Sequence, residues 1–430
     1  MKKIILFLAA AAMALTACNK TPEVLIEVPV QLIQFGEPYQ IAVPVTLASA
    51  TGSYTQTTDA EGKAIFNVPA GSYQASVSFK IGNTNYNGNA SIAVIESELK
   101  IKEVLINLVA SNTSPLIIKE FYNGGCKDNA GTKNYLYDKY IIVYNNSAEE
   151  VDASRMCITM AQTTNTANTN KYSITDGVLE YEANGFTLAS FGLWWFQTEV
   201  KIAPYSQIVV AINGAIDHTV TYSNSVDLSK ADYCFYDKES GYNLAAAYPA
   251  PAAGIPSDHY MKTYQFGQGT VWIPPMDNAA PFLVMPKESV DITEWVKTEE
   301  NFDNRGTNKS TNFAMVPTTW VLDALEEWPD ADNTKYFRRF PAAVDNGYNI
   351  ATRNLGYTQY RNVDKEATEA IAENAGKLVY GYTGAVSETD TDPSGIDAEA
   401  SIANGAKIVY MDTNNSEKDF HQRKVASLKK

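Results

Sequence analysis

Short runs of alternating apolar and polar residues fill the first quarter of the chain after residue 23. Glycine, proline, aspartate and asparagine separate these runs, and each run has the length of one strand. The spacing predicts a small β-sandwich over residues 24–110. We expect its strands at residues 24–33, 39–47, 54–58, 63–68, 72–81, 89–95 and 103–109.

The clearest turn signals lie in the segment TDAEGKAIFNVPAGSY, residues 58–73. Asp59 and Gly62 predict a hairpin turn, and residues 69–71 predict a second turn. This segment resembles prealbumin-like domains, which also occur as carboxypeptidase regulatory modules. The resemblance implies a structural spacer and no catalytic role.

A second set of strand-like runs follows the polar linker 111–114 and predicts a larger, mainly β domain over residues 115–430. These runs resemble the opening of a lamin-tail domain, an Ig-like fold in which two edge strands pair first. The resemblance rests on LIIKEFYNG at 116–124, YDKYIIVYNNS at 137–147, VDAS at 151–154, IAPYSQIVVA at 202–211 and WVLDA at 320–324. The chain departs from the family at Ile142, where an acid is usual, and at Pro204, which no glycine follows.

Insertions account for much of this larger domain. Residues 159–170 are rich in threonine and asparagine, and residues 245–256 are rich in alanine and proline, so we expect two exposed loops. Alanine and glutamate in residues 365–374, followed by Gly376, predict one surface helix.

The beginning of the chain resembles a bacterial lipoprotein signal. Two lysines precede the apolar stretch 4–15, which is too short to span a bilayer. The next residues, LTAC, resemble the lipobox, in which the cysteine is acylated and becomes the N-terminus. We expect a signal peptide at 1–17, a lipidated N-terminus and tether at 18–23, and a membrane anchor at Cys18. The alternative is a soluble secreted protein in which Cys18 is incidental.

Asn19 follows the cysteine where the inner-membrane retention signal has aspartate, so we expect delivery to the outer membrane. The segment KTPE at 20–23 matches the surface-export signal of Bacteroidota lipoproteins only loosely, which leaves the periplasmic and surface faces open. With its two domain resemblances and the ending VYMDTNNSEKDF at 409–420, the chain resembles a family of Bacteroidota outer-membrane lipoproteins with a domain of unknown function. That resemblance implies TonB-dependent nutrient uptake and no enzyme.

Composition agrees with a globular, β-rich protein. Hydrophobic residues make up 45% and charged residues 19%, which excludes wholesale disorder, and the 26 tyrosines favour strands. The net charge of −15 opposes binding to nucleic acid or to anionic membrane surfaces. We therefore expect no nucleic-acid partner and contact with the membrane through the lipid anchor.

Catalytic motifs are lacking in the sequence. The histidines, His218, His259 and His421, stand in no metal motif, and no nucleophile or phosphate-loop motif occurs, so we expect no enzyme and no firmly bound cofactor. Three cysteines besides Cys18 leave two alternatives, either one disulfide with one free thiol or three buried unpaired cysteines. These are Cys126, Cys157 and Cys234.

One acidic segment is a weak candidate for calcium. Its alternating oxygen side chains resemble the first half of an EF-hand loop and are Asp390, Asp392, Ser394 and Asp397. Ser401 stands where the bidentate glutamate is needed, so the alternative is a solvated acidic loop.

Large aromatic residues gather in two stretches and are the candidates for binding a ligand or partner. They include Phe191, Trp194, Trp195, Tyr260 and Trp272. In a strand, Trp194 and Trp195 point to opposite faces, so one is expected in the core and the other at the surface. The alternative is that the whole set packs in the core.

The sequence therefore favours a non-catalytic outer-membrane lipoprotein that binds a ligand or docks onto a TonB-dependent uptake system. One alternative is a structural or adhesive surface protein without a small ligand. Another is an envelope hydrolase, which no motif supports.

Overall fold

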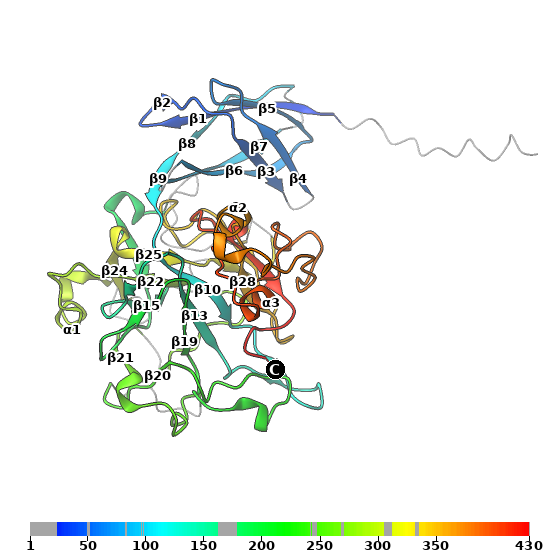
Figure 1. Cartoon of the computed structure of the whole chain (residues 1–430). Helices are drawn as coiled ribbons and strands as arrows, with labels where there is room; N and C mark the ends of the chain where they lie inside the picture. The colour runs from blue at the N-terminus through cyan, green and yellow to red at the C-terminus, as the bar shows by residue number, and fades with distance from the viewer. Residues whose placement is uncertain are drawn as a thin grey trace, which may run out of the picture.

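The computed structural model describes residues 24–49, 52–81, 84–95, 97, 99–161, 179–240, 242, 247–267, 271–304, 312–331 and 335–429 (Figure 1). The predicted signal peptide and Cys18 lie outside the described residues. The described chain is mainly β, which confirms the predicted fold class. Its α-helices are α1 (Ile292–Trp295), α2 (Lys365–Glu369), α3 (Ala398–Ala403) and α4 (Ser416–Asp419).

The N-terminal part, hereafter the sandwich, consists of two facing sheets, drawn in blue and cyan in Figure 1. Its strands are β1 (Ile26–Gln34), β2 (Glu37–Pro38), β3 (Pro44–Ser49), β4 (Gly52–Thr57), β5 (Lys63–Val68), β6 (Gly71–Ile81), β7 (Thr84–Val94), β8 (Val104–Asn107) and β9 (Val109–Asn112). One sheet has the order β2-β1-β5 with β8 beside β1, and the other has the order β4-β3-β6-β7-β9. Apolar side chains of residues 26–108 form a core of their own, because inward and outward positions alternate along the strands.

The predicted turn at Asp59 and Gly62 is present, but it does not close a hairpin. Asp59 Oδ1 accepts hydrogen bonds from the backbone N–H groups of Glu61 and Lys63, at 3.0 and 2.8 Å. Gly62 has a φ of 79°, and a Cβ there would lie 2.0 Å from the carbonyl oxygen of Tyr39. The strand that follows, β5, pairs with β1, so the turn carries the chain from one sheet to the other.

The rest of the chain, residues 115–429 and hereafter the body, is organised around an eleven-stranded sheet. Its strands are β10 (Leu116–Tyr122), β13 (Tyr140–Asn145), β15 (Cys157–Met160), β17 (Gly192–Trp195), β19 (Gln207–Ala211), β20 (Tyr233–Phe235), β21 (Tyr260–Gln265), β22 (Pro281–Val284), β25 (Val321–Ala324), β28 (Thr358–Arg361) and β29 (Phe420–Arg423). The spatial order is β25-β22-β15-β17-β21-β20-β19-β13-β10-β28-β29.

Within the described residues, four small sheets flank the large one. Their strands are β11 (Cys126–Lys127) with β12 (Asn134–Tyr135), β14 (Val151–Asp152) with β18 (Lys201–Ile202), β16 (Phe186–Ala189) with β24 (Asn312–Pro317) and β23 (Phe302–Asn304), and β26 (Glu327–Trp328) with β27 (Asn349–Ile350).

Strands β10 and β13 pair, as the lamin-tail resemblance implied, but they do not lie at an edge. β28 flanks β10 and β19 flanks β13, and every residue of both strands is buried. Burial on both faces forces charged residues of β10 to find partners inside the protein. Lys119 Nζ lies 2.8 Å from Glu399 Oε1, and Glu120 Oε1 accepts a hydrogen bond from the Tyr140 hydroxyl at 2.8 Å.

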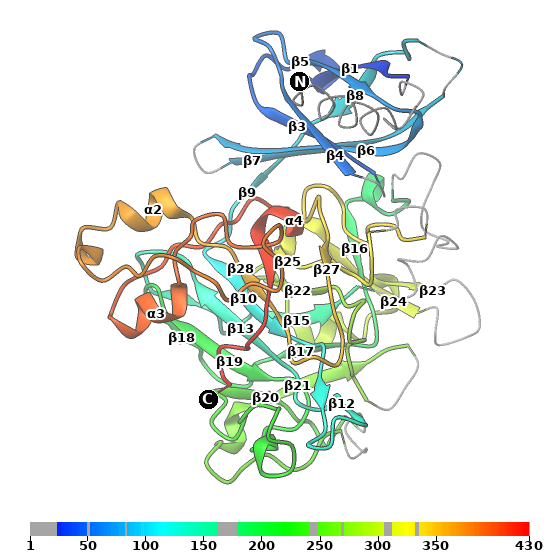
Figure 2. The same cartoon turned by 90° about the vertical axis from the view of Figure 1, so that its right-hand side faces the viewer.

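The sandwich packs directly on the body along β7, and we call this contact the joint. Asn85 and Asn87, both buried, donate from Nδ2 to the carbonyl oxygens of Asp412 and Thr413, at 3.1 and 2.8 Å. Figure 2 shows α4, which follows those carbonyls, beneath β6 and β7. β9 runs to Asn112, so half of the predicted linker 111–114 is strand. The sandwich therefore packs against the body and is not connected to it by a linker alone.

The predicted helix over residues 365–374 is shorter than expected. Asp364 caps α2 by accepting a hydrogen bond from the Ala367 N–H at 3.0 Å, and α2 ends at Glu369. A separate 3-10 turn follows at Ala372–Asn374, because the Asn374 amide donates back to the Thr368 carbonyl at 2.8 Å. Among the described residues, no helix has both the length and the apolar character needed to cross a bilayer.

Candidate functional site

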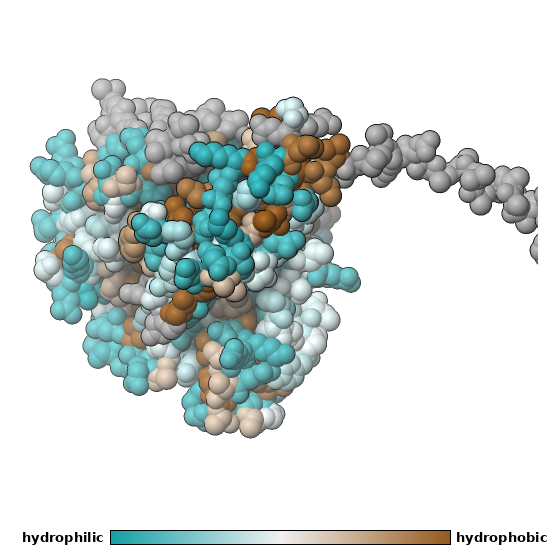
Figure 3. All heavy atoms as spheres, turned by 90° about the horizontal axis from the view of Figure 1, so that it is seen from above, coloured by the Kyte–Doolittle hydropathy of each residue, from teal (hydrophilic) through white to brown (hydrophobic). Residues whose placement is uncertain are grey.

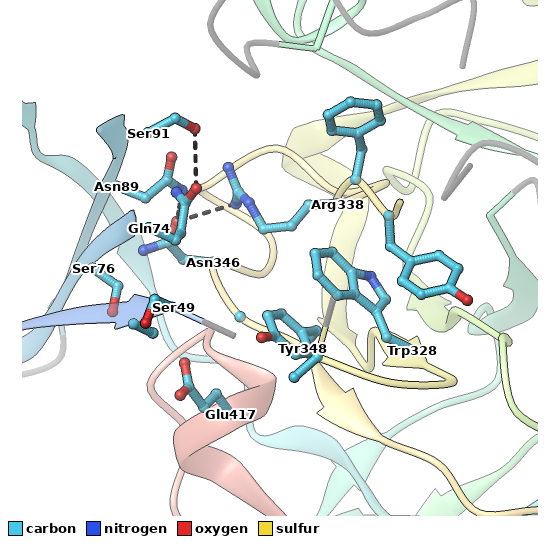
Figure 4. Close-up of a pocket in the computed structure, with 15 residues that line it drawn as sticks. Ser49, Gln74, Ser76, Asn89, Ser91, Trp328, Arg338, Asn346, Tyr348 and Glu417 are labelled. Atoms are coloured by element: carbon cyan, nitrogen blue, oxygen red, sulfur yellow. Dashed lines mark hydrogen bonds between the residues drawn. The ribbon is translucent and has the colours of Figure 1, made fainter. Parts of the chain in front are cut away.

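A cavity of about 300 Å³ lies between the sandwich and the body, and we call it the cleft (Figure 4). This volume is at the lower end of the range for small-molecule sites. The cleft is lined by Ala48, Ser49, Gln74, Ser76, Asn89, Ser91, Trp328, Ala331, Tyr336, Phe337, Arg338, Asn346, Gly347, Tyr348 and Glu417.

The sandwich supplies a wall of neutral polar side chains. Gln74 pairs with Ser91 across β6 and β7, and Ser76 pairs with Asn89 in the next row. Residues two apart on a strand share a face, so these four side chains point away from the sandwich core and toward the body. The Ser91 hydroxyl donates to Gln74 Oε1 at 3.0 Å, which fixes the orientation of the Gln74 amide.

The body supplies an aromatic wall, which faces the polar wall in Figure 4. The rings of Trp328 and Tyr348 stack with their centroids 3.8 Å apart and an interplanar angle of 9°. Tyr336 lies beside them, 5.8 Å from the Trp328 ring. Only 4% of Trp328 is exposed, so the half-buried tyrosines present most of the accessible ring surface.

A buried ion pair holds the aromatic wall in place. Arg339 Nε donates to Glu326 Oε1 at 2.7 Å, and the same oxygen accepts a hydrogen bond from Trp328 Nε1 at 3.2 Å. The Arg339 guanidinium also donates to the carbonyl oxygens of Ala279 and Glu327, at 2.8 and 3.0 Å. Because both charges of the pair are completely buried and multiply bonded, the indole cannot turn without breaking this network.

Asp345 ties the loop beneath Tyr348 to the start of α4. Its Oδ1 accepts hydrogen bonds from the N–H groups of Gly347 and Ser416, at 3.0 and 2.8 Å, and Oδ2 accepts one from the Ser416 hydroxyl. Burial raises the pKa of Asp345 to about 7, while these hydrogen bonds favour the carboxylate. The close approach requires a glycine at 347, where a Cβ would lie 2.1 Å from Asn415 Oδ1.

Polar contacts across the cleft join its two sides. Arg338 Nη1 donates to Asn346 Oδ1 and to the Asp345 carbonyl oxygen, both at 3.1 Å. Asn346 in turn contacts the Asn89 amide and donates to the Gly88 carbonyl oxygen at 3.0 Å. Hence the cleft is formed by residues of both parts and depends on the joint for its shape.

The chemistry of the lining favours binding over catalysis. Of the described residues that line the cleft, Arg338 and Glu417 carry the charges, and the serines have no histidine beside them. Such a site can offer ring surfaces, amides and hydroxyls to a ligand, without an activated nucleophile or a paired acid and base.

The structure places two of the five aromatic candidates in the core. Trp194 and Trp272 are completely buried and both contact Phe235, whose ring stacks on Trp194 at a centroid distance of 4.3 Å and meets Trp272 edge-on at 5.2 Å. Neither can form the exposed shelf expected from the sequence, because both pack inside the main apolar core of the body. Whether the half-buried side chains bind a partner stays a prediction, and they are Phe191, Trp195 and Tyr260.

The oxygen side chains of the acidic segment bond to backbone rather than converging on one point. Asp392 Oδ1 accepts from the Ser394 N–H at 2.8 Å, and Asp397 Oδ1 caps α3 by accepting from the Ala400 N–H at 3.0 Å. Asp390 Oδ2 lies 3.5 Å from the Gln422 nitrogen. No three histidine, cysteine, aspartate or glutamate side chains in the described ranges gather as a metal site, and calcium binding by this segment stays a prediction.

The remaining cysteines are free and buried, which is the second of the two alternatives raised by the sequence. Burial raises the pKa of Cys126 and of Cys234 to about 12, so neither thiol is reactive at neutral pH. His218 bonds to Tyr135, whereas His421 bonds to Tyr382 and Asn362, and burial lowers the pKa of His421 to about 3. These groups serve the packing of the body.

Sequence reasoning missed the cleft residues. Trp328, Tyr336 and Tyr348 come from an ordinary-looking stretch with no strand or helix period. The segment YFRRF at 336–340 is a signal that was available, because two arginines among aromatic residues in a weakly patterned region indicate a functional loop.

Comparison with known proteins gives the family. The family model described as "Protein of unknown function (DUF4876)" matches residues 203–427, which is more than half of the chain. The chain belongs to the DUF4876 family. The match covers most of the body, including Trp328, Tyr348 and the remaining aromatic wall of the cleft. The prealbumin-like and lamin-tail-like resemblances stay predictions.

A solved structure agrees with this assignment at the level of the fold. The crystal structure of a DUF4876 family protein from Bacteroides thetaiotaomicron is 22% identical, covers 92% of this chain and 94% of that chain, and has a TM-score of 0.53. A DUF3823 family protein from Parabacteroides merdae is 9% identical over 32% of this chain and 67% of that chain, with a TM-score of 0.18, which is too low to support an argument. No curated protein matches the chain.

Proposed function

We propose that this DUF4876 protein is a non-catalytic lipoprotein of the outer membrane that binds a ligand in the cleft and serves a TonB-dependent nutrient uptake system. The observation that carries the proposal is the cleft itself, in which stacked aromatic rings face a row of amides and hydroxyls. Binding sites combine ring surfaces with a few polar groups in this way.

Exposed apolar side chains near the first described residue support anchoring at that end. Val24, Leu25 and Leu99 are 46%, 52% and 79% exposed, and the Leu99 carbonyl accepts a hydrogen bond from the Glu27 N–H. Figure 3, which looks down on the sandwich, shows hydrophobic atoms gathered where the described chain begins. Residues 18–23 reach at most about 20 Å, so an acylated Cys18 would hold this apolar end at the membrane surface.

The proposal is tested on protein purified in mild detergent from the membranes of cells that make it. We expect mass spectrometry to find an acylated cysteine at position 18, a co-purifying TonB-dependent receptor, and a small molecule that is released on denaturation. Cys18→Ala should abolish acylation and leave the protein unprocessed or released, but it should keep the small molecule. Tyr348→Ala should keep the anchor but lose the small molecule.

The two variants separate the parts of the proposal. A Cys18→Ala protein that is still acylated would contradict the anchor, and a small molecule retained by Tyr348→Ala would contradict the cleft as its site.

A further inference from the structure

The two walls of the cleft offer different chemical groups to a ligand. On the sandwich side, the Gln74 amide nitrogen and the Ser76 hydroxyl have no hydrogen-bond partner among the described residues. On the body side, the Tyr348 ring is held flat by its stack on Trp328. A ligand that satisfies both walls needs an apolar face on one side and hydrogen-bonding groups on the other.

The charges in the lining do not select a strongly charged ligand. Arg338 already donates to Asn346 and to the Asp345 carbonyl oxygen, and the other charged residue of the lining, Glu417 on α4, has the opposite sign. A phosphate group in the cleft would therefore meet one guanidinium, some of whose N–H groups already donate to the protein. One such group is too little to bind a dianion tightly. A fatty-acid chain would leave buried amides and hydroxyls without partners, at about 1–3 kcal/mol for each group.

We propose that the cleft binds a neutral carbohydrate of one or two sugar rings. The inference rests on the proposed function, since it names the ligand class of the same cleft. A pyranose has a C–H face that can lie on the Tyr348 ring and equatorial hydroxyls that can both donate to and accept from Gln74, Ser76 and Ser91. The volume of about 300 Å³ suits a ligand of this size.

The test is calorimetric titration of the full chain in mild detergent. The probes are neutral hexoses and their disaccharides and, as competing classes, inorganic phosphate, a mixture of amino acids and a medium-chain fatty acid. We expect at least one saccharide to bind. Tyr348→Ala should lower the affinity for that saccharide about tenfold or more, because the stacking surface is lost.

Two control variants separate loss of the ring from loss of folding. Tyr348→Phe keeps the ring and should keep the saccharide affinity within about threefold. Leu105→Ser changes an exposed residue of β8, on the sheet of the sandwich that does not line the cleft, and should leave the affinity unchanged. Thermal melting of each variant shows whether it is folded.

Each outcome decides between the two proposals. If phosphate, an amino acid or the fatty acid binds instead and Tyr348→Ala removes that binding, the carbohydrate inference is overturned and the proposed function stands. Saccharide binding that Tyr348→Ala leaves unchanged overturns the assignment of the carbohydrate to the cleft. If no probe binds and Tyr348→Ala protein from membranes retains the same small molecules as the wild type, both proposals fail.

Discussion

Asn85 and Asp412 meet at the joint, where Asn85 Nδ2 donates to the Asp412 carbonyl oxygen at 3.1 Å. The carboxylate of Asp412 is also buried there, with Oδ1 4.0 Å from Arg361 Nη1. Neither carboxylate oxygen has a hydrogen-bond partner within the described part of the chain. Arg361 is shared with Asp323 and with Asp419, so one guanidinium serves three carboxylates. The contact between sandwich and body thus includes an acid whose ionisation is unfavourable.

The first prediction concerns the pH dependence of this acid. Burial, with a further contribution from Asp323, raises the pKa of Asp412 from 3.8 to about 8. The folded protein therefore holds the proton more tightly than the unfolded chain, and this group's contribution to stability falls as the pH rises from about 4 to about 8. Asp412→Asn removes the ionisation, so at pH 8 the variant should be more stable than the wild type, by on the order of 1–3 kcal/mol.

Denaturant unfolding across this pH range measures the effect as a difference between the two proteins. The two unfolding free energies must be subtracted because Glu327 titrates in the same pH range in the wild type and in Asp412→Asn. Burial raises the pKa of Glu327 to about 8. Glu288→Gln is a matched control, since its side chain is 93% exposed. Parallel pH profiles for wild type and Asp412→Asn would contradict the prediction.

Removing residues 24–110 tests whether the body folds alone. The sandwich has its own apolar core, so we expect the fragment 115–430 to keep a cooperative unfolding transition. The carbonyl groups of Asp412 and Thr413 would lose Asn85 and Asn87, and we expect the fragment to be less stable by about 1–3 kcal/mol. Calorimetry of the fragment and of the full chain measures both effects. A broad, non-cooperative transition of the fragment would show that the sandwich is integral to the body.

The strands of the sandwich were predictable because their signal is local. The alternation in residues 63–68 coincides with β5, and the expected strand at 72–81 differs from β6 by one residue. Each of these strands has one buried and one exposed face, which the sequence displays directly as a period of two.

The cleft was not predictable, because docking brings its walls together. Gln74 faces outward on the sandwich and Trp328 belongs to a two-residue strand of the body, and neither position shows in its own segment what lies opposite. The aromatic density around Trp194 was visible, but its burial was not. The sheet of the body is covered on both sides, so its strands lack the alternation that would have shown which ring is inside.

A pair of tryptophan variants separates core packing from binding. Trp194 is completely buried and stacked on Phe235, so Trp194→Ala should cost about 3–5 kcal/mol of unfolding free energy. Trp195 is half-buried at the edge of a second cluster, and Trp195→Ala should cost about 1–2 kcal/mol. Equilibrium unfolding gives both values. A stable Trp194→Ala protein with impaired partner binding would instead support the exposed shelf expected from the sequence.

The last prediction concerns the glycine that lets the aromatic loop approach α4. At Gly347 a Cβ would lie 2.1 Å from Asn415 Oδ1 and 2.7 Å from the Glu417 nitrogen, so Gly347→Ala must push the loop away from the helix. The shift would strain the hydrogen bonds of Asp345 and displace Tyr348, and we expect a loss of about 1–3 kcal/mol in stability together with weaker ligand binding. Gly254→Ala is the matched control, since a Cβ there meets no atom within 4 Å. Melting curves and ligand titration of the two variants should differ, and equal behaviour would mean that the cleft tolerates movement of this loop.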